Sequence, residues 1–259
     1  MTDTGFAAAL KDWRRRRRMS QLDLGLTSDV SARHISFLET GRARPSRSMV
    51  LRLCETLDVP RPARNTLLNA AGFAPAYRSR DLDTPHMDSV RQALVWTLDR
   101  HDPYPALALD RHWTLVRLNR AAARLLSAAG LAAGDSLLQA LLDPNGLPST
   151  IANWPEVAHH LSVRLRTESA HYGGDTFLEE AASALAEAAE PFQNPPSTPL
   201  PAIIATRYRL GEIELALFST LAQFGTAEDM ALAELKIELL FPDDEATRLT
   251  LEQLASAGS

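Results

Sequence analysis

The stretch that decides the fold runs from Met19 to Ser46, MSQLDLGLTSDVSARHISFLETGRARPS. Ser20 is a favourable N-cap, because its hydroxyl can accept a hydrogen bond from an unpaired N–H group of the following helix. After a polar turn, Ser31 predicts the cap of a second short helix, from Ala32 to about Leu38. Gly41 predicts the end of that helix. The stretch is therefore expected to fold as helix, turn and helix.

The second of these helices is predicted to have an inward and an outward face. Ile35 and Leu38 stand three residues apart and indicate the buried face. The outward face suits a DNA major groove, where each base pair offers a distinct pattern of donors and acceptors. Arg33 can fork onto guanine, and Gln21 can contact phosphate from the start of the preceding helix. We expect DNA contacts from Gln21, Ser31, Ala32, Arg33, His34, Ser36, Arg42 and Arg44.

The flanking sequence predicts three more helices, one before and two after this stretch, which gives an all-α five-helix domain over residues 1–77. Its first helix ends in five arginines, Arg14 to Arg18. Two interpretations stay open for them: they solvate the helix end and favour its dipole, or one or two contact phosphate. Phe37 is also open, between contact with a thymine methyl group and packing inside the domain.

The charge of the chain is unevenly distributed. The net charge is −5. Residues 1–80 contain 15 Lys and Arg against 7 Asp and Glu, and the remainder contains 12 against 25. A basic first part joined to an acidic second part is typical of a nucleic-acid-binding domain linked to a domain that does not contact nucleic acid. Because one such helical domain presents little interface, a homodimer on two DNA half-sites is expected.

Several features predict a cytoplasmic protein. No apolar run approaches the roughly 18 residues that suggest a membrane span, and no secretory signal is visible at the N-terminus. The single cysteine, Cys54, excludes an internal disulfide and fits a reducing compartment. Its helical apolar neighbours predict a buried, unreactive thiol.

The second part of the chain predicts a mixed α and β domain over residues 87–259, after a linker at 78–86. A helix is followed by two strands, over 104–109 and 113–118, and then by helices up to residue 190. A proline-rich connector at 191–201 precedes a hairpin and a further strand near Leu235 to Leu239. A final helix begins after Asp243.

The helix-turn-helix resembles that of lambda-repressor-like regulators of the XRE class. The usual alanine is Gly25 here, and the usual turn glycine is Asp29, a residue type that tolerates the left-handed conformation. The matching positions are Ser20, Gln21, Leu24, Val30, Ser31, Ile35, Ser36, Glu39, Gly41, Arg42 and Pro45.

Nearly the whole chain resembles MmyB-like transcription regulators, through this motif and four further segments, at 70–75, 103–107, 110–113 and 241–245. The resemblance implies an N-terminal DNA-binding domain and a C-terminal ligand-binding domain. The latter would have an α+β PAS-like fold with an antiparallel sheet of about five strands. It also implies a small, largely apolar ligand such as a fatty acid.

A ligand pocket would lie between the curved sheet and the helices of residues 119–190. Plain core packing is the alternative for each candidate lining residue, and helix capping is the alternative for Asn119. A further alternative is a second domain that binds another protein or dimerises without a small ligand. The candidates are Tyr104, Trp113, Asn119, Trp154, Phe218 and Phe224.

We expect no catalytic residues, metal site or cofactor. The histidines at 159, 160 and 171 lack the spacing that places two metal ligands on one helix face. The acidic clusters stand at helix starts, where they complement the helix dipole. The sequence therefore predicts a sequence-specific, ligand-controlled DNA-binding regulator that is not an enzyme.

Overall fold

The computed structural model describes residues 5–77, 82, 84–189, 203–224 and 229–257. The chain forms two compact units, an N-terminal helical unit, with which residues 169–175 cluster, and a mixed α and β unit that begins near residue 80. The connector expected at 191–201 lies outside the described residues, as do most residues of the expected linker up to residue 83.

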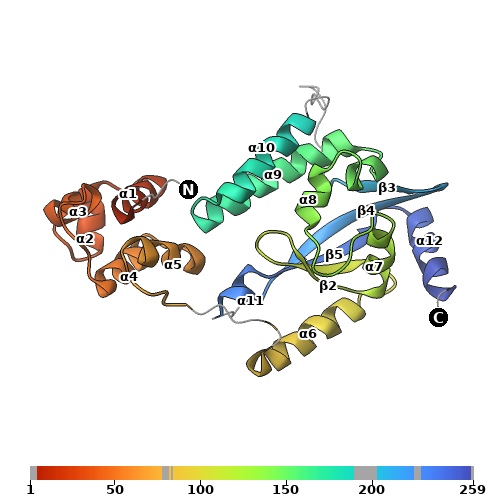
Figure 1. The fold of residues 1–259 in the computed structure, drawn as a ribbon, viewed down its shortest axis with the longest axis horizontal. Coiled ribbons are helices and arrows are strands. Elements are labelled where there is room, and N and C mark those ends of the chain that lie inside the picture. Colours follow the sequence, from red (N-terminus) through yellow and green to blue (C-terminus); the bar gives the residue numbers. More distant parts are fainter. Residues whose placement is uncertain (1–4, 78–81, 83, 190–202, 225–228, 258–259) are drawn as a thin grey trace. The chain divides into compact units, whose positions relative to one another are not determined.

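The helical unit consists, over the described residues, of five α-helices. They are α1 (Phe6–Arg16), α2 (Gln21–Thr27), α3 (Ala32–Glu39), α4 (Arg47–Thr56) and α5 (Arg61–Ala70) (Figure 1). The hydroxyls of Ser20, Ser31 and Ser46 each accept a hydrogen bond from the backbone N–H three residues on. Since each serine satisfies an otherwise unpaired helix N–H, these caps set the starts of α2, α3 and α4.

The helices of this unit share one apolar core. Leu24, Ile35, Leu38 and Leu68 are fully buried in it. Cys54 lies in the same core, and burial raises the pKa of its thiol to about 12. The thiol is therefore protonated at neutral pH, which agrees with the predicted unreactive cysteine.

The second unit combines helices with a five-stranded sheet. Its elements are η1 (Pro85–Met87), α6 (Asp88–Asp99), β1 (Ala106–Leu109), β2 (Leu115–Leu118), α7 (Arg120–Ser127), α8 (Leu137–Leu142), η2 (Leu147–Thr150), α9 (Trp154–Tyr172), α10 (Thr176–Ala188), β3 (Thr206–Leu210), β4 (Ile213–Ala222), α11 (Met230–Glu234), β5 (Lys236–Pro242) and α12 (Glu245–Ser256). The predicted order of two strands, helices and three strands is confirmed. Within the described residues, no helix is long and apolar enough to cross a bilayer.

The sheet is antiparallel, with the strand order β2-β1-β5-β4-β3. Strand β5, the last strand in the sequence, lies in the centre of the sheet and pairs with β1, the first strand. Leu107 of β1 lies opposite Glu238 of β5. Gly211, at a φ of 63°, makes the turn of the β3–β4 hairpin. Glycine adopts this left-handed conformation without steric cost, which is why the hairpin can turn there.

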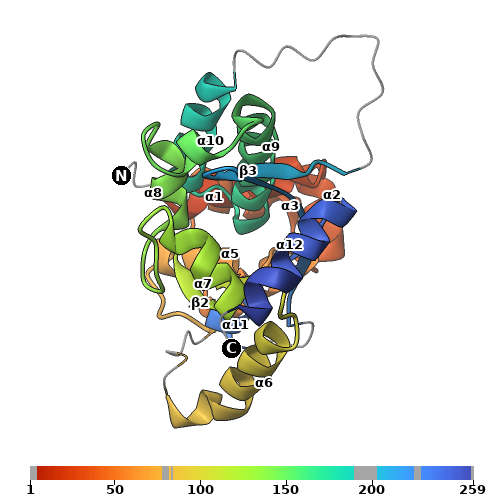
Figure 2. The ribbon, with the colours of Figure 1, turned by 90° about the vertical axis from the view of Figure 1, so that its right-hand side faces the viewer.

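Helices cover both faces of this sheet. Helix α6 lies on one side of the sheet, and α8 and α9 lie on the other (Figures 1 and 2). Leu94 and Leu98 of α6 pack with Ala106 and Ile237 on the first side. Because successive strand residues point to opposite faces, Lys236 and Glu238 of β5 are buried on the side of α9.

Candidate functional site

Helix α3 has one face in the core and one toward solvent. Ile35 and Leu38 are completely buried, whereas Arg33 is exposed. The guanidinium carbon of Arg33 lies 5.3 Å from the centroid of the half-buried Phe37 ring. A cation over an aromatic face is attracted to it, so this contact restricts where the Arg33 side chain points. Phe37 therefore lies beside the exposed Arg33 and helps to fix the position of its guanidinium group.

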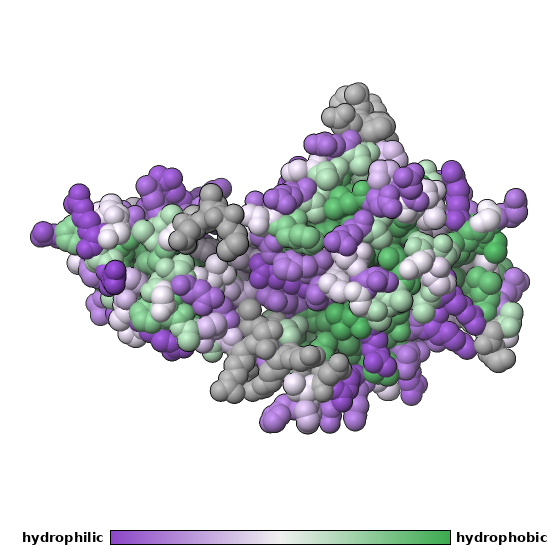
Figure 3. All heavy atoms as spheres, viewed as in Figure 1, coloured by the Kyte–Doolittle hydropathy of each residue, from purple (hydrophilic) through white to green (hydrophobic). Residues whose placement is uncertain are grey.

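The remaining candidate DNA contacts fall into two groups. Arg42 and Arg44 are exposed on the segment that follows α3. Ser31 uses its hydroxyl to accept from the His34 N–H at 3.2 Å, which commits that oxygen to the helix cap. The half-buried candidates are Gln21, Ala32, His34 and Ser36. Hydrophilic residues project from much of the visible outline of this unit (Figure 3).

The turn between α2 and α3 depends on two residues that depart from the usual motif. Asp29 has a φ of 54°, so the chain uses the left-handed conformation at the position expected. A Cβ atom on Gly25 would lie 2.5 Å from the Val30 carbonyl oxygen and 3.1 Å from the Ala32 nitrogen. The backbone of the turn therefore approaches α2 too closely for any side chain at position 25.

A buried carboxylate connects the first three helices. Glu39 Oε1 and Oε2 accept hydrogen bonds from Arg14 at 2.6 and 2.9 Å, and Oε2 also accepts from Gln21 Nε2 at 2.8 Å. Burial opposes ionisation of Glu39, but the bonds from Arg14 and Gln21 outweigh it and hold the pKa below its ordinary value. The Gln21 amide, a candidate phosphate ligand, is thus held by Glu39 in the absence of DNA.

The run of five arginines divides in the structure. Arg14 is used by Glu39, and Arg16 pairs with Asp12 at 2.7 Å. Arg17 donates to the carbonyl oxygens of Leu57 and Asp58 at the end of α4. Arg15 and Arg18 remain exposed. Three of the five therefore stabilise the helical unit, while Arg15 and Arg18 stay candidates for phosphate contact.

The second unit contains a cavity of about 110 Å³ between the sheet and helices α7 to α9, which we name the internal cavity and which reaches the surface near the exposed Ser219. Its walls are mainly apolar and leucine is the commonest residue, as at Leu107, Leu126, Leu141, Leu161, Leu217 and Leu240. At one end the lining becomes polar, with Arg164, Glu238 and Tyr208. Burial raises the pKa of Tyr208, so its phenol is neutral and can donate a hydrogen bond. This combination of an apolar wall and a few polar groups is typical of a small-molecule site.

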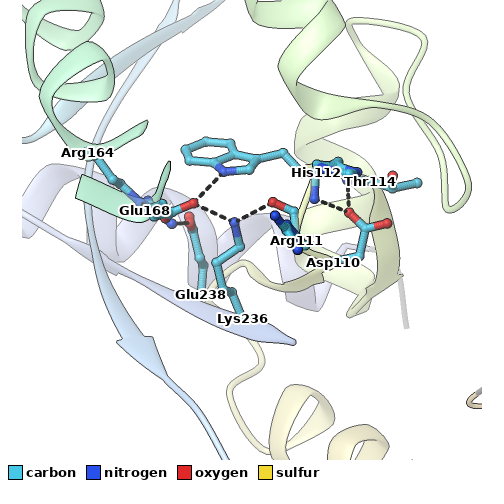
Figure 4. A network of polar contacts seen from close by, with 9 residues as sticks. Asp110, Arg111, His112, Thr114, Arg164, Glu168, Lys236 and Glu238 are labelled. Carbon is cyan, nitrogen blue, oxygen red and sulfur yellow. Dashed lines mark hydrogen bonds and ion pairs between the residues drawn. The ribbon is translucent and has the colours of Figure 1, made fainter. Parts of the chain in front are cut away.

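A network of charged side chains connects α9 to β5 (Figure 4), and two of its members, Arg164 and Glu238, line this cavity. Glu168 Oε2 accepts from Lys236 Nζ at 2.8 Å and from the Trp113 indole N–H at 2.9 Å. Glu168 Oε1 accepts from Arg164 Nε at 2.9 Å, and Arg164 Nη2 donates to Glu238 Oε1 at 2.5 Å. Helix α9 and strand β5 thus each contribute one cation and one carboxylate, and each cation bonds the carboxylate of the other element.

The network is electrically balanced and largely removed from water. Burial alone would raise the pKa of Glu168, but the charges of Lys236 and Arg164 outweigh it and lower that pKa. Burial lowers the pKa of Lys236, whose side chain is only 2% exposed. The Arg164 guanidinium carbon and Lys236 Nζ also lie 4.4 and 4.9 Å from the centroid of the Trp113 ring. Trp113 therefore lies against both cations.

One of the six candidate ligand residues, Trp113, lines the cavity. Asn119 is buried as a structural group: its Oδ1 accepts from Ala106 and Ala122, and its Nδ2 donates to carbonyl oxygens of Leu98 and Tyr104. The other four, Tyr104, Trp154, Phe218 and Phe224, are not among the lining residues.

Two of these aromatic residues belong to the opposite face of the sheet or to its edge. Phe218 stacks on Phe241 at 5.7 Å between ring centroids, and Phe224 packs against the core beneath α6. Phe218 directly follows the lining residue Leu217 in β4, and consecutive strand residues point to opposite faces of the sheet. The structure therefore does not bring the six candidates together around one space.

Sequence reasoning did not identify Arg164, Glu168, Lys236 and Glu238 as site residues. A signal was present in β5, where Lys236 and Glu238 alternate with apolar residues. That alternation correctly predicts a strand, but it is also typical of a strand with a solvated face. Their partners lie on α9, more than sixty positions earlier, and local periodicity contains no information on that pairing.

The fold and these sites define a class of protein: a helix-turn-helix domain followed by an α+β domain with a five-stranded antiparallel sheet. Residues 6–67 match the helix-turn-helix domain family, and residues 90–254 match the MmyB-like transcription regulator ligand binding domain. The second match covers well over half of the chain, and the chain belongs to this family. In the described residues, no group of three or more His, Cys, Asp or Glu side chains is placed to hold a metal ion.

Comparisons with individual proteins add little to the family assignment. One solved structure is the PAS domain of BvgS from Bordetella pertussis, at 15% identity and a TM-score of 0.30, covering 66% of this chain and 98% of that one. Another is an RNA-binding light-oxygen-voltage receptor, at 14% identity and a TM-score of 0.27, covering 97% of this chain and 65% of that one. No curated protein matches the sequence.

Proposed function

We propose that the protein is a sequence-specific DNA-binding transcription regulator in which α3 reads the major groove. The main observation in support is that Arg33 is exposed, lies over the Phe37 ring and is followed by the exposed Arg42 and Arg44. An arginine near the start of a recognition helix can form two hydrogen bonds with guanine, and arginines beyond it can neutralise phosphates. A homodimer would place two such helices on half-sites about one helical turn apart.

We further propose that the PAS-like domain binds a small apolar ligand, such as a fatty acid, in the internal cavity. Leucine walls with Trp113, Tyr208 and Arg164 at one end support this proposal. A ligand can shift the regulator between states only by the difference in its affinity for them. Such a ligand therefore has to bind the DNA-competent and DNA-incompetent forms unequally.

Selection from random DNA duplexes with the full chain, followed by fluorescence anisotropy, tests the DNA-binding proposal. Arg33→Ala is expected to lose about 1–3 kcal/mol of discrimination at one guanine position, since one bidentate contact disappears. Arg42→Ala should weaken all sequences similarly and reduce the salt slope by about one. Arg61→Ala, which removes the same charge at the start of α5, serves as the matched control. Unchanged affinity and specificity in Arg33→Ala would refute α3 as the reading helix.

Native mass spectrometry of the gently purified chain tests the ligand proposal. A bound small molecule appears as retained mass that disappears after unfolding. If no mass is retained and no apolar probe binds, the second domain acts instead as a protein-interaction or dimerisation module. Co-purified protein or a concentration-independent dimer would then be the observation to pursue.

A further inference from the structure

A second cavity lies beside the internal one and opens to solvent. It has a volume of about 240 Å³ and is lined by α7, α12, the β3–β4 hairpin and the segment before β1. Its walls are mostly apolar, and Ile213 and Leu254 at its edge are 39% and 41% exposed. Hydrophobic residues also reach the surface beside α12 and this hairpin in the space-filling view (Figure 3). We name this space the outer cavity.

The outer and internal cavities share one wall. Leu125 of α7 lines both of them and is 8% exposed. On the sheet, Leu215 of the outer cavity pairs across the hairpin with Tyr208 of the internal one. The two spaces are therefore neighbours along one face of the sheet, with the Leu125 side chain between them.

The internal cavity alone is small for the function proposed above. Its volume of about 110 Å³ falls below the range of roughly 300–1,000 Å³ that is typical of small-molecule sites. The two cavities together fall within that range. Leu125 lines both, so a displacement of its side chain is the simplest way to join them.

Charge differs between the two ends of this combined space. The internal end is balanced, because Arg164 already bonds Glu168 and Glu238. The outer cavity is lined by two arginines, Arg120 and Arg124, and one acid, Asp102. Arg124 donates to the Leu254 carbonyl at 2.6 Å, and Arg120 lies 3.8 Å from Asp102. The lining of the outer cavity thus contains more basic than acidic side chains.

We propose that the outer cavity is the mouth of the ligand site and that an elongated amphiphile enters it tail first, past Leu125, with an anionic end held at Arg120 and Arg124. The proposal rests on the ligand-binding function proposed above. A further negative charge at the internal end would compete with Glu238 for Arg164 and lose its own hydration. At the mouth the same charge meets arginines and water, while the apolar tail fills leucine-lined space.

Calorimetric titration of the delipidated full chain with dodecanoate and dodecanol tests the charge assignment. Arg120→Gln and Arg124→Gln should each weaken dodecanoate binding several-fold, and at least tenfold in combination, with less than a twofold effect on dodecanol. Arg117→Gln, on β2 and outside both cavities, should leave both affinities unchanged. Equal binding of dodecanoate by all variants would overturn the proposal that the outer cavity is the mouth of the ligand site. Retained dodecanol binding shows that a variant is folded.

Quenching by 12-bromododecanoate tests the orientation, because bromine quenches tryptophan at short range. Tail-first binding places the bromine near Trp113 in the internal cavity, so quenching should exceed that by dodecanoate and disappear in Trp113→Phe. Binding without this quenching would overturn the tail-first orientation.

The two proposals fail differently. Loss of binding in Ala122→Leu, which fills the internal cavity, together with unchanged binding in the arginine variants would overturn the mouth and leave the ligand function intact. No binding of either probe to the wild-type chain would overturn both.

Discussion

Lys236 Nζ lies 2.8 Å from Glu168 Oε2, which joins the central strand β5 to helix α9 across a separation of 68 residues. Both side chains are largely buried, at 2% and 16% exposure. An ion pair of this kind stabilises little relative to apolar residues of the same shape, but removal of one partner leaves an uncompensated charge. The pair is therefore expected to make the unit sensitive to single substitutions.

Lys236→Met should destabilise the α+β unit by about 3–5 kcal/mol, because Glu168 loses one of its two cations inside the fold. Urea unfolding followed by tryptophan fluorescence measures the change. Lys11→Met, at an exposed lysine of α1, is the control and should stay within about 0.5 kcal/mol. The double variant Lys236→Met, Glu168→Gln should lose less than the sum of the single losses. Strict additivity would contradict the coupling.

Stability should fall with acid partly through Glu168. Its folded pKa lies below the ordinary value of 4.5. The carboxylate therefore contributes stability above the unfolded pKa, and this contribution is lost as the pH falls through the folded pKa. Glu168→Gln should be less stable at neutral pH, and its stability should depend less on pH below about 4.5. Unfolding free energies measured from pH 3 to pH 7 test this, and parallel curves for both proteins would contradict it.

Gly25→Ala should destabilise the helical unit, although alanine favours a helix over glycine by about 1 kcal/mol. The added Cβ would meet the Val30 carbonyl oxygen at 2.5 Å, and a backbone atom cannot move aside as a flexible side chain can. We expect a loss of about 1–3 kcal/mol from this overpacking. Thermal unfolding measures it, with Ala8→Gly on the exposed face of α1 as a contrasting substitution. A stabilised Gly25→Ala variant would disprove the close approach.

Asp29→Gly should stabilise the same unit by up to about 1 kcal/mol, because glycine adopts a φ near 54° without a Cβ penalty. Asp29→Val places a branched side chain in the same conformation and should destabilise the helical unit. The order glycine, aspartate, valine in melting temperature is the expected result. Any other order would show that the turn does not require the left-handed conformation in solution.

Much of the secondary structure follows from short-range chemistry, and for that reason the sequence predicts it well. Ser20, Ser31 and Ser46 cap helices where their hydroxyls reach backbone N–H groups three residues away. Asn119 begins α7 by accepting from the Ala122 N–H. Such contacts depend only on residues close together in the chain. The order of the strands also agrees, because strand length and alternation are local properties.

The site depends on long-range relationships that the sequence does not reveal. Phe218 and Leu217 are neighbours in the chain, yet only Leu217 lines the internal cavity, because the face chosen by β4 depends on the packing of α6 and α9. Asn119 has its polar atoms committed to backbone groups of two earlier segments, the end of α6 and residues 104–106. A candidate list based on residue type therefore includes one residue that lines this cavity, Trp113, but none of the ionic network against it.

The balanced charge of the network limits how this domain can change over generations. Neutralising only one of Lys236, Glu168, Arg164 and Glu238 leaves one unbalanced charge inside the protein. Substitutions at these four positions should therefore occur together in related proteins. The leucines of the opposite wall have no such constraint, and each can be replaced alone by another apolar residue. Related family members should therefore vary most along the leucine wall, while the four charged positions stay fixed or change as a block.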